Sequence, residues 1–268
     1  MPDSPIGVVY NTSMSRPDAA LALAAMYLME RRNESRMGSV CVVGAGLATA
    51  VFCDMIARMY FPAVRDGNQA LAIGLADDGS PDPPMVQASV AHHYPTTIHS
   101  VSDTSAPEAV LRNGVIFNAE SVVILSAPAT YLAKTLDLAG AKDLYTDRVK
   151  RLIVVEAGTS YNDAAALRRI VAEWPTPVVF CPNEVGEALR FPGVTFETTP
   201  ASPVVDAYEA YQPMPYDAPL HDLAAAHYAI HPDSGFFRLN AKTIEIVPEK
   251  KPRLLAALIA MATAKPGR

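Results

Sequence analysis

Two polar segments that lie about two hundred residues apart contain the side chains best suited to chemistry. The first is the turn after an opening apolar strand, within Ile6–Asp18, and the second is His221-Asp222 at the start of a helical run. In an α/β protein the carboxyl ends of the strands share one crevice, so a loop after the first strand and a polar pair far downstream can meet there. Carboxylates that meet in such a crevice could hold a metal ion. Asp18, however, is the only carboxylate of the opening turn.

The elements that would position these segments alternate along the chain. Continuous apolar runs predict strands that are buried on both faces, as in a parallel sheet. They are Ile6–Tyr10, Val40–Val43, Leu71–Leu75, Val122–Leu125, Leu152–Val155 and Val178–Phe180. Helical patterns occur at Asp18–Arg31, Leu47–Tyr60, Pro107–Arg112, Ala129–Leu138, Asp163–Glu173, Val185–Leu189, Val204–Tyr211, Asp222–Ala229 and Pro252–Ala262. This order predicts a single α/β domain over residues 1–268, with an open, mostly parallel, doubly wound sheet flanked by helices.

Composition restricts the class of protein and of partner. Half of the 268 residues are hydrophobic and 19% are charged, which is enough apolar sequence for a large core. The net charge of −6 and the pI near 5.5 argue against a nucleic-acid-binding surface. No apolar run approaches the ~20 residues that span a bilayer, and the N-terminus lacks the basic region of a signal peptide. Cys41, Cys53 and Cys181 are widely spaced in apolar runs, which favours buried, reduced thiols. We expect a cytoplasmic protein with neither a nucleic-acid nor a membrane partner.

One glycine motif resembles a dinucleotide-binding fingerprint. Val42–Ala50 follows a strand and precedes a helix, the context that this fingerprint requires. Thr49 replaces the third glycine, and Asp66, near the expected distance for a ribose-binding acid, lies in a sequence typical of a turn. A tight strand-to-helix turn that binds no dinucleotide is therefore the favoured interpretation.

Several segments together resemble the nucleoside hydrolase family, the calcium-dependent, inosine–uridine-preferring N-ribohydrolases. Val122–Ala133 is similar to the family's strand, Gly-Pro-Leu-Thr-Asn turn and following helix, and Leu152–Gly158 to its strand ending in Met-Gly-Gly. Pro203–Tyr208 and Pro219–Ala226 resemble the late helices, including the His-Asp pair. Ile6–Leu23 aligns without a gap to the opening strand, Asp-x-Asp-Pro-Gly-x-Asp-Asp turn and helix. The likeness extends over nearly the whole chain.

The resemblance implies a role for individual residues. Asp18 matches the bidentate calcium ligand, Asp222 the remaining carboxylate ligand and Val155 a backbone carbonyl ligand. His221 matches the histidine beside the leaving base, and His99 falls near another active-site histidine. Asn11 and Ser13 occupy two acidic positions of the family turn, Ser13 that of the base, while Pro17 replaces the acid that binds the ribose. Asn162 could stand in for an amide of the ribose-binding loop, which is shortened to Thr159–Asn162.

These replacements weaken the chemistry that the resemblance implies. Calcium takes 6–8 oxygen ligands and its affinity depends on the number of carboxylates, so Asp18 and Asp222 predict weak or absent calcium binding. Loss of the base at Ser13 should alone cost about 10²–10⁴ in rate. Both surviving acids have another interpretation, because an acid at the start of a helix commonly caps it.

Two functions remain open on the sequence. One is hydrolysis of the N-glycosidic bond of a nucleoside or related riboside, with weak or altered activity. The other is a catalytically inactive family member, a pseudoenzyme that retains the fold for binding or assembly. The resemblance also implies a small-molecule riboside as the partner of an active protein, a place in purine and pyrimidine metabolism, and homo-oligomerisation.

Overall fold

The computed structural model describes residues 5–61, 71–158 and 163–264. The strands of the main sheet are β1 (Ile6–Thr12), β2 (Ser35–Val42), β3 (Ile73–Leu75), β4 (Ser121–Ser126), β5 (Val149–Val155), β6 (Val178–Cys181), β9 (Phe237–Asn240) and β10 (Thr243–Ile246). A small second sheet pairs β7 (Arg190–Pro192) with β8 (Asp217–Pro219). The α-helices are α1 (Pro17–Arg31), α2 (Leu47–Tyr60), α4 (Pro84–Val90), α5 (Pro107–Ile116), α6 (Thr130–Thr135), α7 (Ala141–Arg148), α8 (Ala164–Glu173), α9 (Asn183–Ala188), α10 (Pro203–Tyr211), α11 (His221–Ile230) and α12 (Lys251–Ala262).

The main sheet is almost entirely parallel. Its order is β3-β2-β1-β4-β5-β6-β10-β9, and only the edge strand β9 pairs in the antiparallel sense. The interiors of β1, β4 and β5 are buried, as continuous apolar runs between two helical layers should be. The predicted mostly parallel, doubly wound α/β sheet is therefore confirmed.

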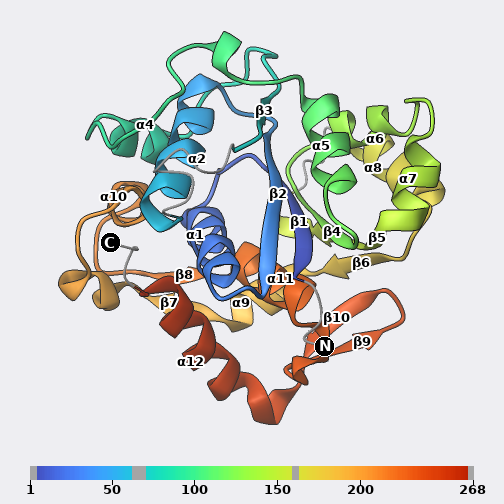
Figure 1. The fold of residues 1–268 in the computed structure, drawn as a ribbon. Coiled ribbons are helices and arrows are strands. Elements are labelled where there is room, and N and C mark those ends of the chain that lie inside the picture. Colours follow the sequence, from blue (N-terminus) through green and yellow to red (C-terminus); the bar gives the residue numbers. More distant parts are fainter. Residues whose placement is uncertain (1–4, 62–70, 159–162, 265–268) are drawn as a thin grey trace.

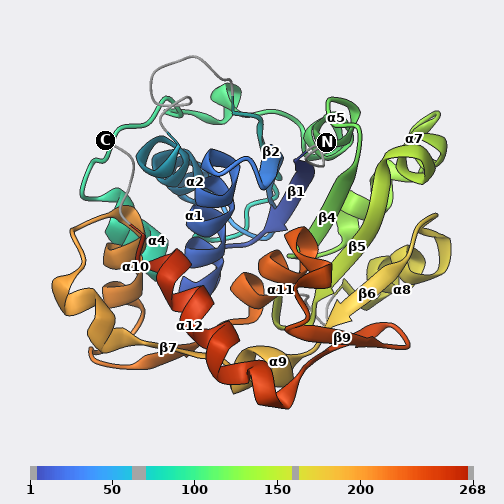
Figure 2. The same cartoon turned by 60° about the horizontal axis from the view of Figure 1, so that its bottom comes forward.

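Helices cover both faces of the sheet (Figures 1 and 2). The layer that contains α1, α2, α10, α11 and α12 lies over one face, and α5 to α8 lie over the other. Within the first layer α1 is the central helix, since it contacts α2, α10, α11 and α12 and is buried from Pro17 to Met29. Its many alanines allow neighbouring helices to approach from several sides. The helix that follows the opening turn is thus held on every side.

Some elements differ from the sequence prediction. β2 begins at Ser35 rather than Val40, and Leu71–Leu75 shortens to β3. Helices α4 and α7 and the β9–β10 hairpin were not predicted. α4 begins at Pro84 in a proline-rich stretch that reads as a loop, because proline is tolerated at the first helical position. The hairpin lies at the sheet edge and has polar, exposed positions, so it lacks the apolar run of a buried strand.

The position of β1 in the sheet determines where a crevice can form. β1 pairs with β2 on one side and with β4 on the other, and Thr12 lies opposite Ser126 at the carboxyl ends of the second pair. The winding of the chain reverses between β1 and β4, and such a switch point opens a crevice at the carboxyl ends of the strands. The turn after β1 leads directly into it.

The glycine motif before α2 does not leave a free anion site. The Asp82 carboxylate accepts hydrogen bonds from the backbone N–H groups of Ala48 (3.2 Å) and Thr49 (2.8 Å) and from the Thr49 hydroxyl (2.6 Å). A Cβ at Gly46 would lie 2.7 Å from that carboxylate. Asp82 therefore occupies the place where a dinucleotide phosphate would meet the helix N-terminus.

Two further expectations concern the state of the cysteines and the presence of membrane-spanning helices. Cys41, Cys53 and Cys181 are buried and unpaired, and burial raises the pKa of each thiol well above its ordinary value. Of the helices in the described part of the chain, none has both the length and the apolar character needed to cross a bilayer.

Candidate functional site

The turn after β1 brings Arg16, Pro17 and Asp18 to the crevice. The Met14 backbone has a φ of 48°, and its N–H donates to the Thr12 hydroxyl at 3.0 Å, which reverses the chain after the strand. Arg16 then precedes α1 in an extended conformation, Pro17 occupies the first helical position and Asp18 lies in the first turn. Proline suits this position because it has no N–H to leave unpaired.

Asp18 and Asp222 lie together in this crevice. The Asp222 backbone N–H donates to Asp18 Oδ2 at 2.6 Å, and the Tyr10 hydroxyl donates to Asp222 Oδ1 at 2.9 Å. Asp18 thus accepts from the first turn of α11 rather than from its own helix. The two carboxylates that the sequence separates by about two hundred residues join β1, α1 and α11 at one point.

The Arg16 guanidinium lies between these two carboxylates. Its Nε is 3.3 Å from Asp18 Oδ1, and its Nη2 forms an ion pair with Asp222 Oδ2. Nη1 donates to the Ala157 carbonyl in the short 3-10 helix after β5 (Glu156–Gly158), and Nη2 lies 3.5 Å from the Ser126 hydroxyl at the end of β4. The carboxylate side chains are 1% and 0% exposed and the arginine 19%, so this is a largely buried ion-paired group.

The electrostatics of the group follow from its two acids and one base. Burial lowers the pKa of Arg16, but Asp222 and Asp18 together raise it by more, so the guanidinium stays charged. Burial, followed by repulsion from Asp222, raises the pKa of Asp18 above its ordinary range despite the nearby arginine. Burial raises the pKa of Tyr10 well above its ordinary value, which keeps its hydroxyl a donor to Asp222.

The residues around this point do not fit a calcium ion. Calcium needs six or more oxygen ligands, whereas four oxygens, one each from Asp18, Asp222, Ser126 and Ala157, contact the guanidinium here, and the second oxygens of the two acids already accept from the Asp222 N–H and the Tyr10 hydroxyl. Within the described residues no group of three or more His, Cys, Asp or Glu side chains could hold a metal. A guanidinium takes the central position between the two acids that the resemblance assigns to the metal.

The other residues that the sequence proposes for the site lie in different parts of the structure. The Ser13 hydroxyl donates to Ser15 at 3.1 Å, and Asn11 is fully buried with no partner for its amide among the described residues. Val155 ends β5, but the carbonyl that meets Arg16 belongs to Ala157. His99 is exposed and its backbone N–H donates to Asp103. Asn162 lies outside the described residues.

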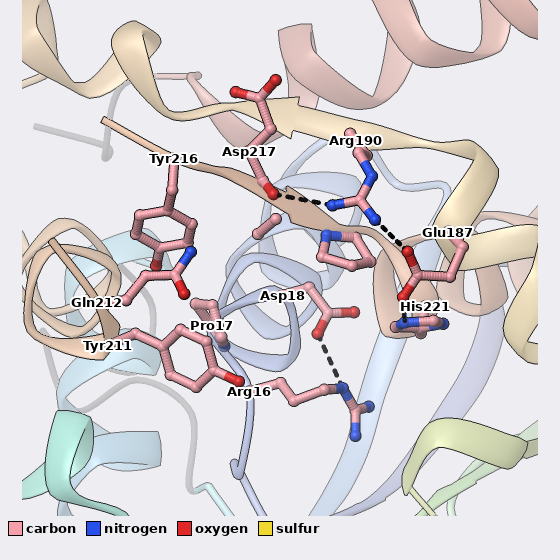
Figure 3. Close-up of a pocket in the computed structure, with 12 residues that line it drawn as sticks. Arg16, Pro17, Asp18, Glu187, Arg190, Tyr211, Gln212, Tyr216, Asp217 and His221 are labelled. Carbon is pink, nitrogen blue, oxygen red and sulfur yellow. Dashed lines mark hydrogen bonds and ion pairs between the residues drawn. The ribbon is translucent and has the colours of Figure 1, made fainter. Parts of the chain in front are cut away.

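A pocket of about 340 Å³ opens beside the ion-paired group (Figure 3). Tyr211, Gln212 and Tyr216 lie on one side of it, and Glu187, Arg190 and His221 on the other. Its remaining lining comes from Arg16, Pro17, Asp18, Asp217, Ala218 and Pro219. The pocket combines aromatic rings with hydroxyl, amide and carboxylate groups, a set that can hold a planar ring and several hydroxyl groups.

His221 is fixed against α9 at the wall of this pocket. A Cβ at Gly186 would lie 2.0 Å from His221 Nδ1, so the imidazole occupies the space that a side chain there would fill. Its Nε2 lies 3.9 Å from a Glu187 carboxylate oxygen. Burial, followed by the charge of Arg16, lowers the pKa of His221, which favours the neutral imidazole.

Sequence reasoning missed Arg16, Tyr10 and the aromatic side of the pocket. The sequence places Arg16 close to Asp18 in a turn where other residues replace the acids of the family motif. The position of the Arg16 side chain, however, depends on Asp222 and Ala157, which are distant in the sequence. Tyr211 and Tyr216 lie in a segment with no motif of its own. Their position follows from where α10 ends, at Tyr211, and from the path of the chain from there to β8.

No protein-family model matches this chain, and no curated protein matches it in sequence. Among solved structures, a plant nucleoside hydrolase (PpNRh1) superposes with a TM-score of 0.68 at 14% identity, over 97% of this chain and 99% of that one.

Two further structures match over similar lengths. The inosine–uridine-preferring nucleoside hydrolase of Bacillus anthracis has a TM-score of 0.64 at 12% identity, over 96% of this chain and all of that one. The type III effector protein XopQ, solved in complex with adenosine diphosphate ribose, has a TM-score of 0.63 at 16% identity, over 98% and 94%. At these identities the likeness establishes the fold alone, and this chain has a nucleoside hydrolase-like fold.

Proposed function

We propose that this protein binds a small, uncharged riboside in the pocket beside Arg16 and hydrolyses its N-glycosidic bond weakly or not at all. The observation that carries the proposal is the Arg16 guanidinium between Asp18 and Asp222. The guanidinium supplies a fixed positive charge at this point but, unlike a metal ion, holds no coordinated water that could attack the bond.

Hydrolysis of this kind needs a strongly activated water, because the nucleobase is a poor leaving group. A guanidinium has no open coordination position and cannot lower the pKa of a bound water as a metal does. Ser13, at the position of the family's base, is an alcohol whose hydroxyl donates to Ser15. Pro17 at the pocket has no side-chain group that could hydrogen-bond a sugar hydroxyl. Each of these features argues for binding over turnover.

The charges around the pocket favour an uncharged ligand. Arg16 pairs with Asp18 and Asp222, and Arg190 pairs with Glu187 while its Nη1 lies 3.3 Å from the Asp217 carbonyl. The first turn of α11 is also taken, since the Asp222 N–H donates to Asp18. Both arginines in the pocket lining and this helix start therefore already have anionic partners. A phosphate would have to displace a carboxylate from one of them.

The aromatic side of the pocket supplies a surface for a nucleobase. Tyr211 is half-exposed, and the Tyr216 ring is held by stacking on Tyr208 at 4.4 Å between centroids and by a 2.6 Å hydrogen bond from its hydroxyl to the Tyr208 carbonyl. A rigid ring beside an accessible one can hold a flat base with little loss of side-chain entropy.

Calorimetric titration with inosine, uridine and adenosine, and with adenosine diphosphate ribose for comparison, tests the binding. We expect a nucleoside to bind and the diphosphate to bind more weakly, and Tyr211→Ala to weaken nucleoside binding about tenfold, the loss of roughly 1.4 kcal/mol from one stacked ring. Phe117→Ala, at an exposed ring outside the pocket lining, is the matched control.

Release of reducing sugar from the same nucleosides and from a nitrophenyl riboside tests the chemistry. We expect turnover that is absent or only slightly above that of an Asp18→Ala variant, and that added calcium does not increase. Calcium-stimulated turnover clearly above that variant would show that the protein is an active hydrolase and would refute the proposal.

A further inference from the structure

The Arg16 guanidinium contacts oxygen atoms from four segments that are far apart in the sequence. Asp18 belongs to the start of α1, Ser126 to the end of β4, Ala157 to the segment after β5 and Asp222 to the start of α11. All four lie at the carboxyl ends of the central strands or at the start of a helix facing them. One side chain thus holds together the parts of the fold that form the crevice.

The kinds of atom around the guanidinium are those that a hard divalent cation prefers. Two carboxylates, one backbone carbonyl and one hydroxyl surround it, and these are oxygen ligands typical of calcium sites. Tyr10 contacts the opposite oxygen of Asp222 and so helps to hold that carboxylate in place. The site differs from a metal site in its central group, because a side chain of the chain itself carries the positive charge.

Burial makes the central charge important for both acids. Asp18 and Asp222 are almost fully buried and are joined by the hydrogen bond from the Asp222 backbone N–H to Asp18, and negative charge on both side chains would repel in a medium that screens poorly. Removal of the guanidinium would leave that repulsion uncompensated. The vacated space and the unpaired acids would then favour a cation from solution.

We infer that Arg16 is a built-in replacement for a divalent cation, that it excludes metal from this crevice, and that shortening residue 16 uncovers a latent cation site. The oxygens of that site are those that now contact the guanidinium: Asp18, Asp222, Ser126 and the Ala157 carbonyl. Because the donors are few, the affinity of the uncovered site for calcium falls in the weak range of about 10⁻⁴–10⁻³ M.

The test compares calcium binding by the wild type, Arg16→Ala and the double variant Arg16→Ala/Asp222→Asn, using calorimetric titration and melting temperature in EDTA and in calcium. We expect no saturable binding and an unchanged melting temperature for the wild type. Arg16→Ala should melt several degrees lower in EDTA and recover much of the loss in calcium, because a ligand that binds only the native state raises its stability. The double variant should lose the calcium response.

Arg190→Ala is the matched control, since it removes the other arginine of the pocket without exposing the buried acids. It should gain no calcium response. An Arg16→Ala protein that folds and binds no calcium would overturn the inference. So would a wild-type protein that binds calcium through Asp222, as shown by loss of that binding in Asp222→Asn.

If Arg16→Ala is not recovered in folded form, refolding from denaturant with calcium or with EDTA provides a second measurement. Recovery that requires calcium supports the inference. If neither condition restores the fold, the Arg16→Lys variant is tested, because lysine retains the positive charge. A folded Arg16→Lys protein whose stability does not change with calcium supports the inference. An Arg16→Lys protein that calcium stabilises contradicts it. These outcomes do not depend on nucleoside binding, so this inference and the proposed function fail separately.

Discussion

Tyr10 is the side chain through which the first strand holds the buried acid pair. Its hydroxyl donates to Asp222 at 2.9 Å, and both residues are fully buried. Tyr10→Phe leaves that carboxylate oxygen without its donor, and hydrogen bonds to charged groups contribute about 1.5–3 kcal/mol. We expect the variant to lose stability in that range, as measured by urea unfolding at neutral pH.

Tyr27→Phe is a control of the same chemistry in the same hydrophobic core. Tyr27 is also fully buried, but its hydroxyl has no hydrogen-bond partner among the described residues. Removing that hydroxyl should change the free energy of unfolding by less than about 0.5 kcal/mol, or stabilise the protein, because no bond is lost. Equal losses in the two variants would show that the Tyr10 hydrogen bond contributes nothing specific.

Asp18 and Arg16 show which residues of the site can be predicted from the sequence and which cannot. Asp18 and Asp222 could be identified because their positions match a family motif and because strand ends converge in a parallel sheet. Arg16 lies two residues before Asp18, yet its role depends on where a flexible side chain of several rotatable bonds points. That direction is set by Asp222, Ala157 and Ser126, which become neighbours of Arg16 only in the folded chain.

Helices α9 and α11 each contribute one side chain to the pocket lining, Glu187 and His221, and Gly186 determines how closely the two helices approach. The His221 imidazole fills the space beside this glycine. Gly186→Ala therefore forces the ring to move, and overpacking of this kind costs about 1–3 kcal/mol. We expect the variant to be less stable by that amount in urea unfolding and to bind nucleosides more weakly.

A double-mutant cycle separates this clash from a general effect of alanine in α9. His221→Ala removes the ring, so Gly186→Ala should cost much less in that background, with a coupling energy of about 0.5–3 kcal/mol. If the cost of Gly186→Ala is the same in both backgrounds, the close contact between the two helices is not its cause.

The elements that the sequence patterns predicted well are those whose surroundings stay the same along their whole length. β1, β4 and β5 are buried on both faces and appear in the sequence as apolar runs. α4 and the β9–β10 hairpin are partly exposed and contain proline or charged residues, so their structure comes from packing against the rest of the molecule. A pattern of hydrophobicity along the chain carries little information about such contacts.

For the whole molecule, stability against acid depends on a second histidine of α11. His227 is buried among His231, Phe236 and Phe237, and its Nδ1 has no partner within the described residues. Burial, followed by repulsion from His231, lowers its pKa from 6.5 to about 4. The folded protein therefore favours the neutral imidazole, whereas the unfolded chain binds a proton near pH 6.5.

The sign of the effect on folding follows from this difference. A histidine with a lowered pKa contributes its full stability above pH 6.5, and that contribution is lost as the pH falls toward 4. The shift from 6.5 to about 4 corresponds to a loss on the order of 3 kcal/mol between these pH values. Asp222 lies at the start of α11 and His227 near its end. Unfolding of α11 around His227 in acid would therefore also open the crevice around Asp222.

His227→Gln tests this account, because glutamine is polar but does not titrate. The free energy of unfolding in urea, measured from pH 7.5 to pH 4, should fall less steeply for the variant than for the wild type, by up to about 3 kcal/mol over the range. His231→Gln, at a partly exposed histidine that pairs with Glu34 at 3.0 Å, is the control: it removes only the smaller of the two causes of the lowered His227 pKa and should keep most of the wild-type slope. Parallel curves for the wild type and His227→Gln would mean that groups elsewhere set the acid limit, and the buried end of α11 would then unfold for a reason other than the charge on His227.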